Sequence, residues 1–206
     1  MKKLIMGLTI HYNGRFNKDA CLSEMIDEVK DYLDTLEWTY MVFRKQFPEG
    51  EPDIDLKDMH VYGIHFTPPR CETVSLCFLE NRRMTSVARV LFSDENENGA
   101  DDDMLYMLST KTQQAGPGIH ITIIKLFKHL IKKGYFEKLE VFDEGKYWET
   151  EDEEILINNF KKNAALIDSF ALAIESTKQK KDESIEEYLA RVADKLKNRN
   201  KNTTED

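Results

Sequence analysis

The sequence predicts an α+β fold: a mainly antiparallel sheet of about six or seven strands, helices packed on one face, and a C-terminal helical appendage. Short apolar segments follow one another along much of the first 110 residues with short links between them, and such links join antiparallel neighbours. After residue 118, apolar residues instead recur every three or four positions, which is typical of helices with one buried face. A polar linker, KQKKDE at 178–183, precedes the last helical pattern.

Composition and charge narrow the class of protein. The chain has 206 residues, of which 41% are apolar and 10% aromatic, enough for a packed core in one domain. We expect a single α+β domain at 1–178, followed by an amphipathic helix and a polar tail at 179–206. The net charge of −9 repels phosphate groups, so we expect no nucleic-acid partner and no membrane partner.

The cysteines and the N-terminal segment favour a cytoplasmic location. Cys21, Cys71 and Cys77 form no CxxC pair and have no histidine at metal-ligand spacing, so we expect reduced thiols, no metal and no cofactor. The apolar run Leu4–Ile10 is short and is followed by polar residues without a cleavage site, which indicates a first strand rather than a signal peptide. No stretch approaches the roughly 20 apolar residues that span a bilayer.

In the first half of the chain, turn residues separate runs that are rich in β-branched and aromatic side chains. Asn13–Gly14 is expected to end the first strand and Pro48 the second, and Asn81–Arg83 is short enough for a hairpin. We therefore expect strands at 4–11, 38–47, 59–66, 72–80, 84–92 and 104–109, and one amphipathic helix at 22–36.

The second half is predicted to be helical with one short strand. We expect a helix over 119–133 and a strand over 139–142. Thr150–Glu153 has the spacing of a capping box, in which a hydroxyl and a carboxylate cap each other's amides, and should open a helix that ends near Ser176. A second capping box, Ser184–Glu187, should open the last helix.

The stretch TKTQQAGPGIH at 110–120 joins a predicted strand to a predicted helix. A helix N-terminus exposes unpaired amides that bind anions. Gly116 and Gly118 would admit a ligand close to the backbone, and Lys111, Thr112 and Gln113 would add donors, so this turn is a candidate ligand site. The spacing matches neither GxxxxGK[ST] nor GxGxxG. The alternative is a turn that ends the strand and uses its proline in the first helical turn.

His120 lies near the middle of the apolar arc of its predicted helix, so its side chain should point toward the sheet. The helix dipole disfavours a protonated ring in the first turn. A neutral imidazole there would act as a base or hydrogen-bond donor, with Asp143 or Glu144 as the carboxylate that orients it. The alternative is a buried histidine hydrogen-bonded to a carbonyl or a carboxylate.

Two acidic segments are candidate protein-binding surfaces. Carboxylates stand beside Tyr147 and Trp148, residue types that often anchor interfaces; the alternative is a turn in which Trp148 packs against the next helix. The loop containing Asp101 and Asp102 begins like an EF-hand calcium loop but lacks the glutamate at position twelve. We expect an acidic hairpin tip there rather than a dedicated calcium site.

Two hypotheses for function follow. The first is a non-enzymatic, acidic, cytoplasmic protein that binds a protein with a basic surface, as an inhibitor or immunity protein covers a toxin's active site; it depends on the charge and on the lack of a complete catalytic motif. The second is a small-molecule-binding enzyme or sensor with a pocket at the 111–118 turn, centred on His120. The oligomeric state is open, and the apolar stripe at 185–196 offers a route to self-association.

Overall fold

The structure is a computed structural model that describes residues 7–48, 60–91 and 106–202, with side chains described up to residue 195. In chain order its elements are β1 (Thr9–Phe16), α1 (Leu22–Thr35), β2 (Thr39–Val42), β3 (Tyr62–Thr67), β4 (Val74–Phe78), β5 (Met84–Thr85), α2 (Val87–Leu91), β6 (Leu108–Lys111), α4 (Pro117–Lys132), β7 (Phe136–Asp143), α5 (Tyr147–Thr150), α6 (Glu153–Glu175) and α7 (Ile185–Asn202).

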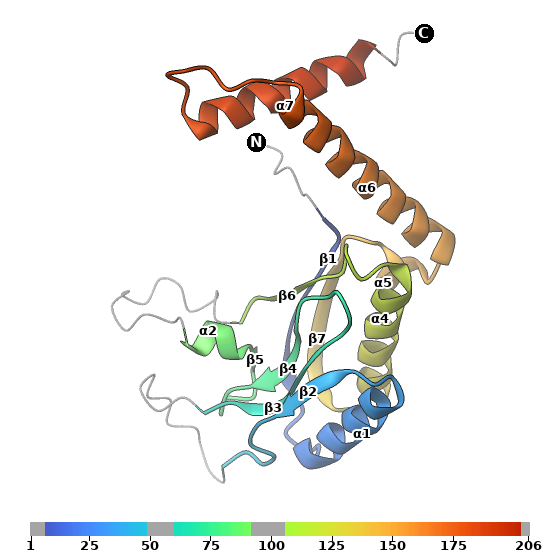
Figure 1. The fold of residues 1–206 in the computed structure, drawn as a ribbon. Helices are drawn as coiled ribbons and strands as arrows, with labels where there is room; N and C mark the ends of the chain where they lie inside the picture. The colour runs from blue at the N-terminus through green and yellow to red at the C-terminus, as the bar shows by residue number, and fades with distance from the viewer. Residues whose placement is uncertain (1–6, 49–59, 92–105, 203–206) are drawn as a thin grey trace.

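The strands form two antiparallel sheets (Figure 1), which confirms the α+β class. The second sheet, β2-β3-β4-β5, is a meander in which each strand pairs with the next. The first has the order β6-β1-β7, with Thr9 opposite Lys111 and Ile10 opposite Asp143. The expectation of one sheet is therefore corrected, because the first strand pairs with partners far along the chain instead of with its neighbour in sequence.

Hydrogen bonds join the two sheets both at their margins and in the interior. The amide of Phe16 donates to the carbonyl of Arg82 at 2.8 Å, next to an isolated bridge between Arg15 and Arg83. In the interior, the amide of Ser75 donates to the hydroxyl of Tyr12 at 2.8 Å. Both of these residues are buried, so the tyrosine satisfies a polar group where water does not reach.

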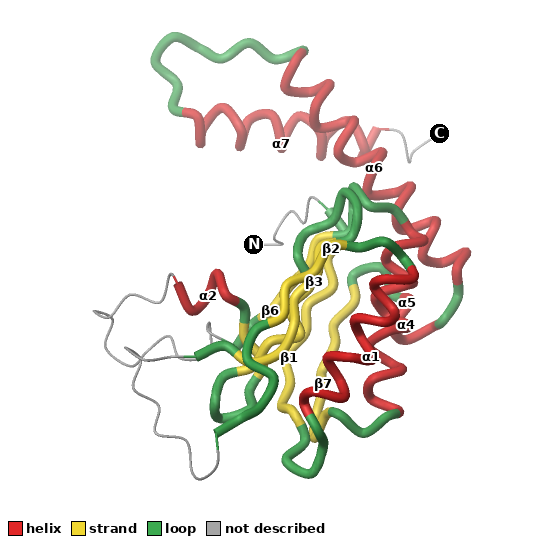
Figure 2. The backbone as a smooth tube through the Cα atoms, turned by 60° about the horizontal axis from the view of Figure 1, so that its bottom comes forward, coloured by secondary structure: helices red, strands yellow, loops and turns green. Residues whose placement is uncertain are grey.

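Helices α1 and α4 lie side by side over the strands (Figures 1 and 2), as their apolar periodicity predicts. Glu28 of α1 links them: its carboxylate accepts hydrogen bonds from His129 of α4 at 2.7 Å and from the Tyr135 hydroxyl at 2.8 Å, and it lies 2.9 Å from the Lys133 ammonium. Burial alone would raise the pKa of Glu28, but these partners outweigh it and lower the pKa to about 2.

The core between sheets and helices is aromatic at one end. Phe16 is fully buried, with Phe78 in an edge-on contact at 5.2 Å and Phe47 at 5.6 Å between ring centroids. Tyr12 meets Phe127 of α4 at 5.0 Å. These contacts hold β1 between the helical layer and the second sheet.

The first strand differs from its predicted position. Strand β1 continues through Asn13 and Gly14 to Phe16, so the predicted turn at Asn13–Gly14 is wrong. A side chain at Gly14 would place a Cβ 2.6 Å from the carbonyl oxygen of Lys138. The glycine therefore serves the close approach of β7 to β1 rather than a turn.

The predicted strand at 84–92 is wrong beyond its first two residues. Met84 and Thr85 pair with β4 as β5, and the chain then forms the short helix α2. The hydroxyl of Ser86 accepts the amide of Arg89 at 3.2 Å. A serine that caps a helix in this way overrides the strand preference of the β-branched residues that follow.

The start of the long helix α6 also differs from its predicted position. Thr150 belongs to the one-turn helix α5, and Glu151 has a left-handed φ of 54° that separates the two helices. Asp152 is the cap, and its carboxylate accepts the amides of Glu154 and Ile155 at 2.8 and 3.2 Å. The second predicted capping box is confirmed: Ser184 and Glu187 accept each other's amides at 3.1 and 3.0 Å.

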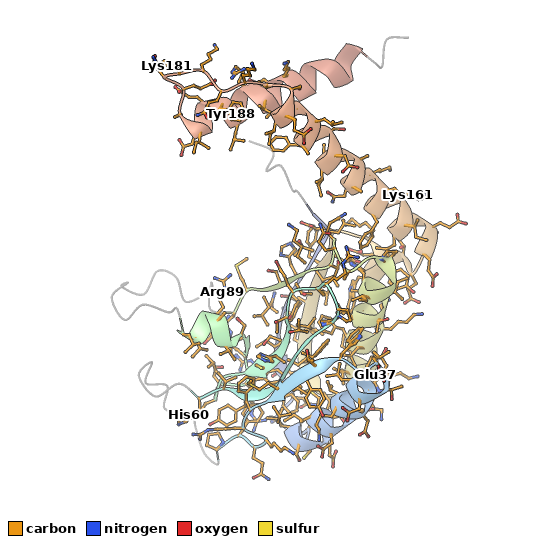
Figure 3. The ribbon with its side chains drawn as sticks, viewed as in Figure 1. Glu37, His60, Arg89, Lys161, Lys181 and Tyr188 are labelled. Atoms are coloured by element: carbon orange, nitrogen blue, oxygen red, sulfur yellow. The ribbon has the colours of Figure 1, made fainter. Side chains whose placement is uncertain are left out.

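Helix α6 runs away from the sheets and α7 crosses its far end (Figures 1 and 2). We call α6 and α7 together the arm. Phe160 buries the near end of α6 in the core, and Ala173 is buried at its far end. The Tyr188 hydroxyl (Figure 3) lies 2.9 Å from the carbonyl oxygen of Ile174 and 2.8 Å from that of Thr177, where it closes the last turn of α6. None of the described helices is long and apolar enough to cross a membrane.

Candidate functional site

The turn between β6 and α4 carries four of the residues predicted to bind a ligand. The amide of Lys111 donates to the carboxylate of Glu72 at 2.9 Å, and the Lys111 side chain is exposed. The side-chain oxygen of Gln113 accepts the amide of Leu8 at 3.1 Å. Both residues therefore hold neighbouring segments in place, and neither one hydrogen-bonds to His120.

The two glycines of this turn differ in their roles. Gly116 caps α4 with a φ of 88°, a conformation that favours glycine. Gly118 has no such constraint, and a Cβ built at either position would meet no atom within 4 Å. The first turn of α4 thus begins at an open surface, and Pro117 occupies an early helical position, as expected of a strand-ending turn.

His120 is fully buried and faces the sheet, as its place in the apolar arc predicts. Its Nδ1 lies 2.8 Å from the hydroxyl of Thr112, the residue that follows β6, and its Nε2 lies 3.0 Å from Oδ1 of Asp143 at the end of β7. The ring of Phe160 from α6 meets the imidazole edge-on at 5.8 Å. Three polar groups from three elements therefore converge beneath the arm.

The contact between His120 and Asp143 is electrostatic. At 3.0 Å the atoms are at ion-pair distance, yet Nε2 has no described partner in hydrogen-bond geometry. Burial tends to raise the pKa of Asp143, but the imidazole and two backbone amides outweigh it, so its pKa falls below the ordinary value of 3.8. An ionised carboxylate repels a lone pair, so we place a proton on Nε2.

Asp143 also organises the segment that follows β7. Its two oxygens accept the amides of Gly145 at 2.6 Å and Trp148 at 2.9 Å. A Cβ at Gly145 would lie 3.0 Å from a ring carbon of His120 and 2.5 Å from the side chain of Leu156. The chain thus packs directly over the imidazole, and neither His120 nor Asp143 exposes any side-chain surface.

Glu144 points away from this cluster, although it follows Asp143 directly. Its carboxylate accepts the amide of Thr9 at 2.9 Å and lies 3.4 Å from Nε2 of His11, a half-exposed side chain on β1. Of the two carboxylates considered as partners of His120, only Asp143 meets it. Glu144 instead fastens the start of β1 to the end of β7.

The aromatic residues predicted to bind a protein are largely inside the fold. Tyr147 is buried in the core, and Trp148 is half-buried against it. Lys128 of α4 stands over the Trp148 ring, 5.3 Å from its centroid, and pairs with Glu151. Trp148 therefore packs between α4 and the start of the arm. Asp101 and Asp102, with the rest of the acidic loop, lie outside the described residues.

Thr112 is the member of the His120 cluster whose role the sequence left unassigned. It appeared only as a possible donor to a ligand, whereas its hydroxyl is buried between the imidazole and the carbonyl of Leu8, 3.3 Å away. The spacing in the sequence could have indicated this role, because residues two apart in an extended segment face the same side. Thr110 and Thr112 have that spacing, and the structure buries both of them fully. A buried threonine needs a hydrogen-bond partner, and His120 is the nearest polar side chain that the helix supplies.

The described residues hold no group of three or more histidine, cysteine, aspartate or glutamate side chains that could bind a metal ion. The chain matches no family model, no curated protein and no solved structure.

Proposed function

We propose that this protein acts by binding another protein, and that the arm formed by α6 and α7 carries the contact surface. One observation carries the proposal: half of the twelve exposed large apolar side chains among the described residues lie on these two helices. They are Ile155, Ile157, Leu166, Leu172, Ile185 and Leu189. Exposed apolar groups that gather on one element are typical of interaction sites, whereas scattered ones need no explanation.

The exposed fractions of these side chains indicate where a partner protein would make its largest apolar contact. Leu172 exposes 63% and Ile185 exposes 70% of its surface, and Leu189 exposes 39%. Ile185 and Leu189 are one helical turn apart, so they form a stripe on α7. Val192, the next residue along this side, is fully buried. A partner helix with its own apolar stripe would continue this packing, as helices do in bundles and grooves.

The acidic first turn of α7 supports a basic group on the partner beside that apolar centre. Glu186 and Glu187 are exposed there, next to the stripe, and the whole chain has a net charge of −9, although residues 185–202 carry five basic and three acidic side chains. Opposite charge around an apolar patch increases association rates and excludes partners of the wrong sign. This arrangement supports a role in protein binding.

The alternative hypothesis, a pocket centred on His120, receives no support from the geometry. A substrate must reach the group that acts on it, and His120 and Asp143 have no exposed surface. The side chain of Gln113 is engaged by the amide of Leu8, and the side chain of Lys111 is exposed rather than directed at His120. The cluster is better explained as a buried polar junction that fixes where α4, β7 and α6 meet.

The test is affinity capture from the native cell with the full chain, compared across matched variants. We expect Ile185→Glu and Leu189→Glu to reduce recovery of a specific partner at least tenfold, because each places a charge in the apolar contact. Ala190→Glu, an exposed position on another side of α7, is the control and should leave recovery unchanged. Circular dichroism would verify that all three variants are folded. Equal recovery by all variants, or no specific partner, would refute the proposal.

A further inference from the structure

The outer edge of β7 is another candidate contact surface among the described residues. Strand β7 pairs with β1 on one side, and no described strand pairs with its other side. Its hydrogen-bonding groups on that side therefore face outward, as in any edge strand, which makes it a template for another extended chain. In Figure 2 the strand lies at one margin of the yellow strands.

The pairing pattern shows which residues present these groups. The carbonyl of Leu8 accepts from β6, through the amide of Thr112 at 2.9 Å, and the carbonyl of Thr9 accepts from Glu144 at 3.2 Å. Even-numbered residues of β1 therefore bond to β6 and odd-numbered ones to β7, since the two sides alternate along a strand. In β7, Lys138, Glu140 and Phe142 stand opposite the odd-numbered residues. The residues between them, Leu139 and Val141, direct their amides and carbonyls outward.

The edge is short at one end because of a bulge. The register between β1 and β7 shifts after Arg15, so that Glu137 is an extra residue on β7. A bulge ends regular pairing and is a common way to weaken an edge. The regular part of the strand begins at Lys138. It is long enough for a few hydrogen bonds to another strand, which predicts a weak association rather than a permanent one.

The charges beside the β7 edge favour a second copy of this chain as the molecule that pairs with it. Lys138 and Glu140 are on the exposed face of β7, with side chains 66% and 53% exposed, and their charged atoms are 2.6 Å apart. A second β7 running antiparallel must place outward-directed residues opposite each other. In the register centred on Leu139, Lys138 of each copy lies opposite Glu140 of the other, and the regular pairing spans residues 138–140 of each copy because Glu137 belongs to the bulge. Centred on Glu140, it would put two like charges face to face, which is unfavourable.

We propose that two copies of this chain associate through their β7 edges in the register centred on Leu139. Each copy would extend the three-stranded sheet of the other, giving one six-stranded sheet across a twofold axis. The arm takes no part in this contact, so the proposal is independent of the proposed function.

Sedimentation velocity of the full chain over a range of concentrations tests the proposal. We expect a monomer–dimer equilibrium that is weakened about tenfold or more by Lys138→Glu, and likewise by Glu140→Lys, because each creates two like-charge pairs. An equimolar mixture of these two variants should regain the dimer, since each chain then supplies the charges opposite to its partner's. Lys161→Glu on α6 (Figure 3) is the matched control and should not change the equilibrium.

Three outcomes would overturn the proposal. One is a chain that stays monomeric at the highest concentration. Another is a dimer that neither charge reversal weakens, and the third is a pair of weakened variants that the mixture does not rescue. If Leu189→Glu abolishes the dimer while Lys138→Glu leaves it intact, the copies meet through the arm instead. Near-ultraviolet circular dichroism of each variant would verify that lost association is not lost folding.

Discussion

Asp143 at the end of β7 lies 3.0 Å from His120 of α4, and both side chains are completely buried. The same carboxylate accepts the amides of Gly145 and Trp148. A single side chain therefore fixes the positions of α4, the end of β7 and the segment that leads into the arm. Because a buried carboxylate is costly without partners, each of these contacts depends on the others.

Replacing Asp143 tests this dependence. We expect Asp143→Ala to lower the free energy of unfolding by about 3–5 kcal/mol, because it removes one member of a buried pair and leaves two amides without an acceptor. Urea denaturation measures the change. A double-mutant cycle with His120→Ala isolates the pairwise part, and strictly additive losses would show that the imidazole and the carboxylate do not interact.

The Glu28 cluster predicts a specific acid sensitivity. Its folded pKa of about 2 lies below the ordinary 4.5, so the carboxylate contributes stability that is complete above pH 4.5 and is lost as the pH falls from 4.5 to 2. Because solvent screens this partly exposed carboxylate, the loss should be on the order of 1 kcal/mol. Unfolding measured across this window should show a shallower decline for Glu28→Gln than for the native chain. Parallel curves would contradict the assignment.

Replacing glycine by alanine should have opposite effects on stability at Gly63 and at Gly118. At Gly63 the φ is 109° and a Cβ would lie 2.3 Å from the carbonyl oxygen of Leu76, so Gly63→Ala should cost more than about 2 kcal/mol. At Gly118 the space is open and the backbone is helical, so Gly118→Ala should be neutral or stabilising by up to about 1 kcal/mol. Thermal denaturation of both variants would show a fall in Tm for the first only.

The hydroxyl of Tyr188 is expected to hold the two helices of the arm together. Tyr188→Phe leaves the carbonyls of Ile174 and Thr177 without this partner, and should weaken the contact by about 1 kcal/mol. Hydrogen exchange should then become faster in α7 and the last turn of α6 while the sheets are unaffected. Tyr32→Phe, at an exposed position on α1, is the control. Unchanged exchange in α7 would rule out this role.

The sequence predicted the long helices well because an amphipathic helix is recognised from the spacing of apolar residues within one short segment. The buried stripe of α1, the orientation of His120 and the reciprocal cap of Ser184 and Glu187 all follow from residues within a few turns of one another. The meander of β2 to β5 was predictable for the same reason, since its strands are neighbours in the chain.

The position of β1 was decided only by tertiary structure. Asn13–Gly14 has the composition of a turn, and nothing near it in sequence reveals that β7 approaches so closely that glycine is required. The choice between Asp143 and Glu144 as the partner of His120 was undecidable for a related reason. Adjacent residues of a strand point to opposite sides, and only the pairing of β7 with β1 shows which carboxylate faces the core.

What the sequence determined by itself was therefore the set of amphipathic helices, the α+β class and the burial of one histidine. What tertiary structure decided was which distant segments meet: β1 between β6 and β7, Thr112 and Asp143 on either side of His120, and an arm with one end outside the core. The physical reason is that periodicity is a local property, whereas strand pairing and side-chain convergence depend on contacts between residues far apart in the chain.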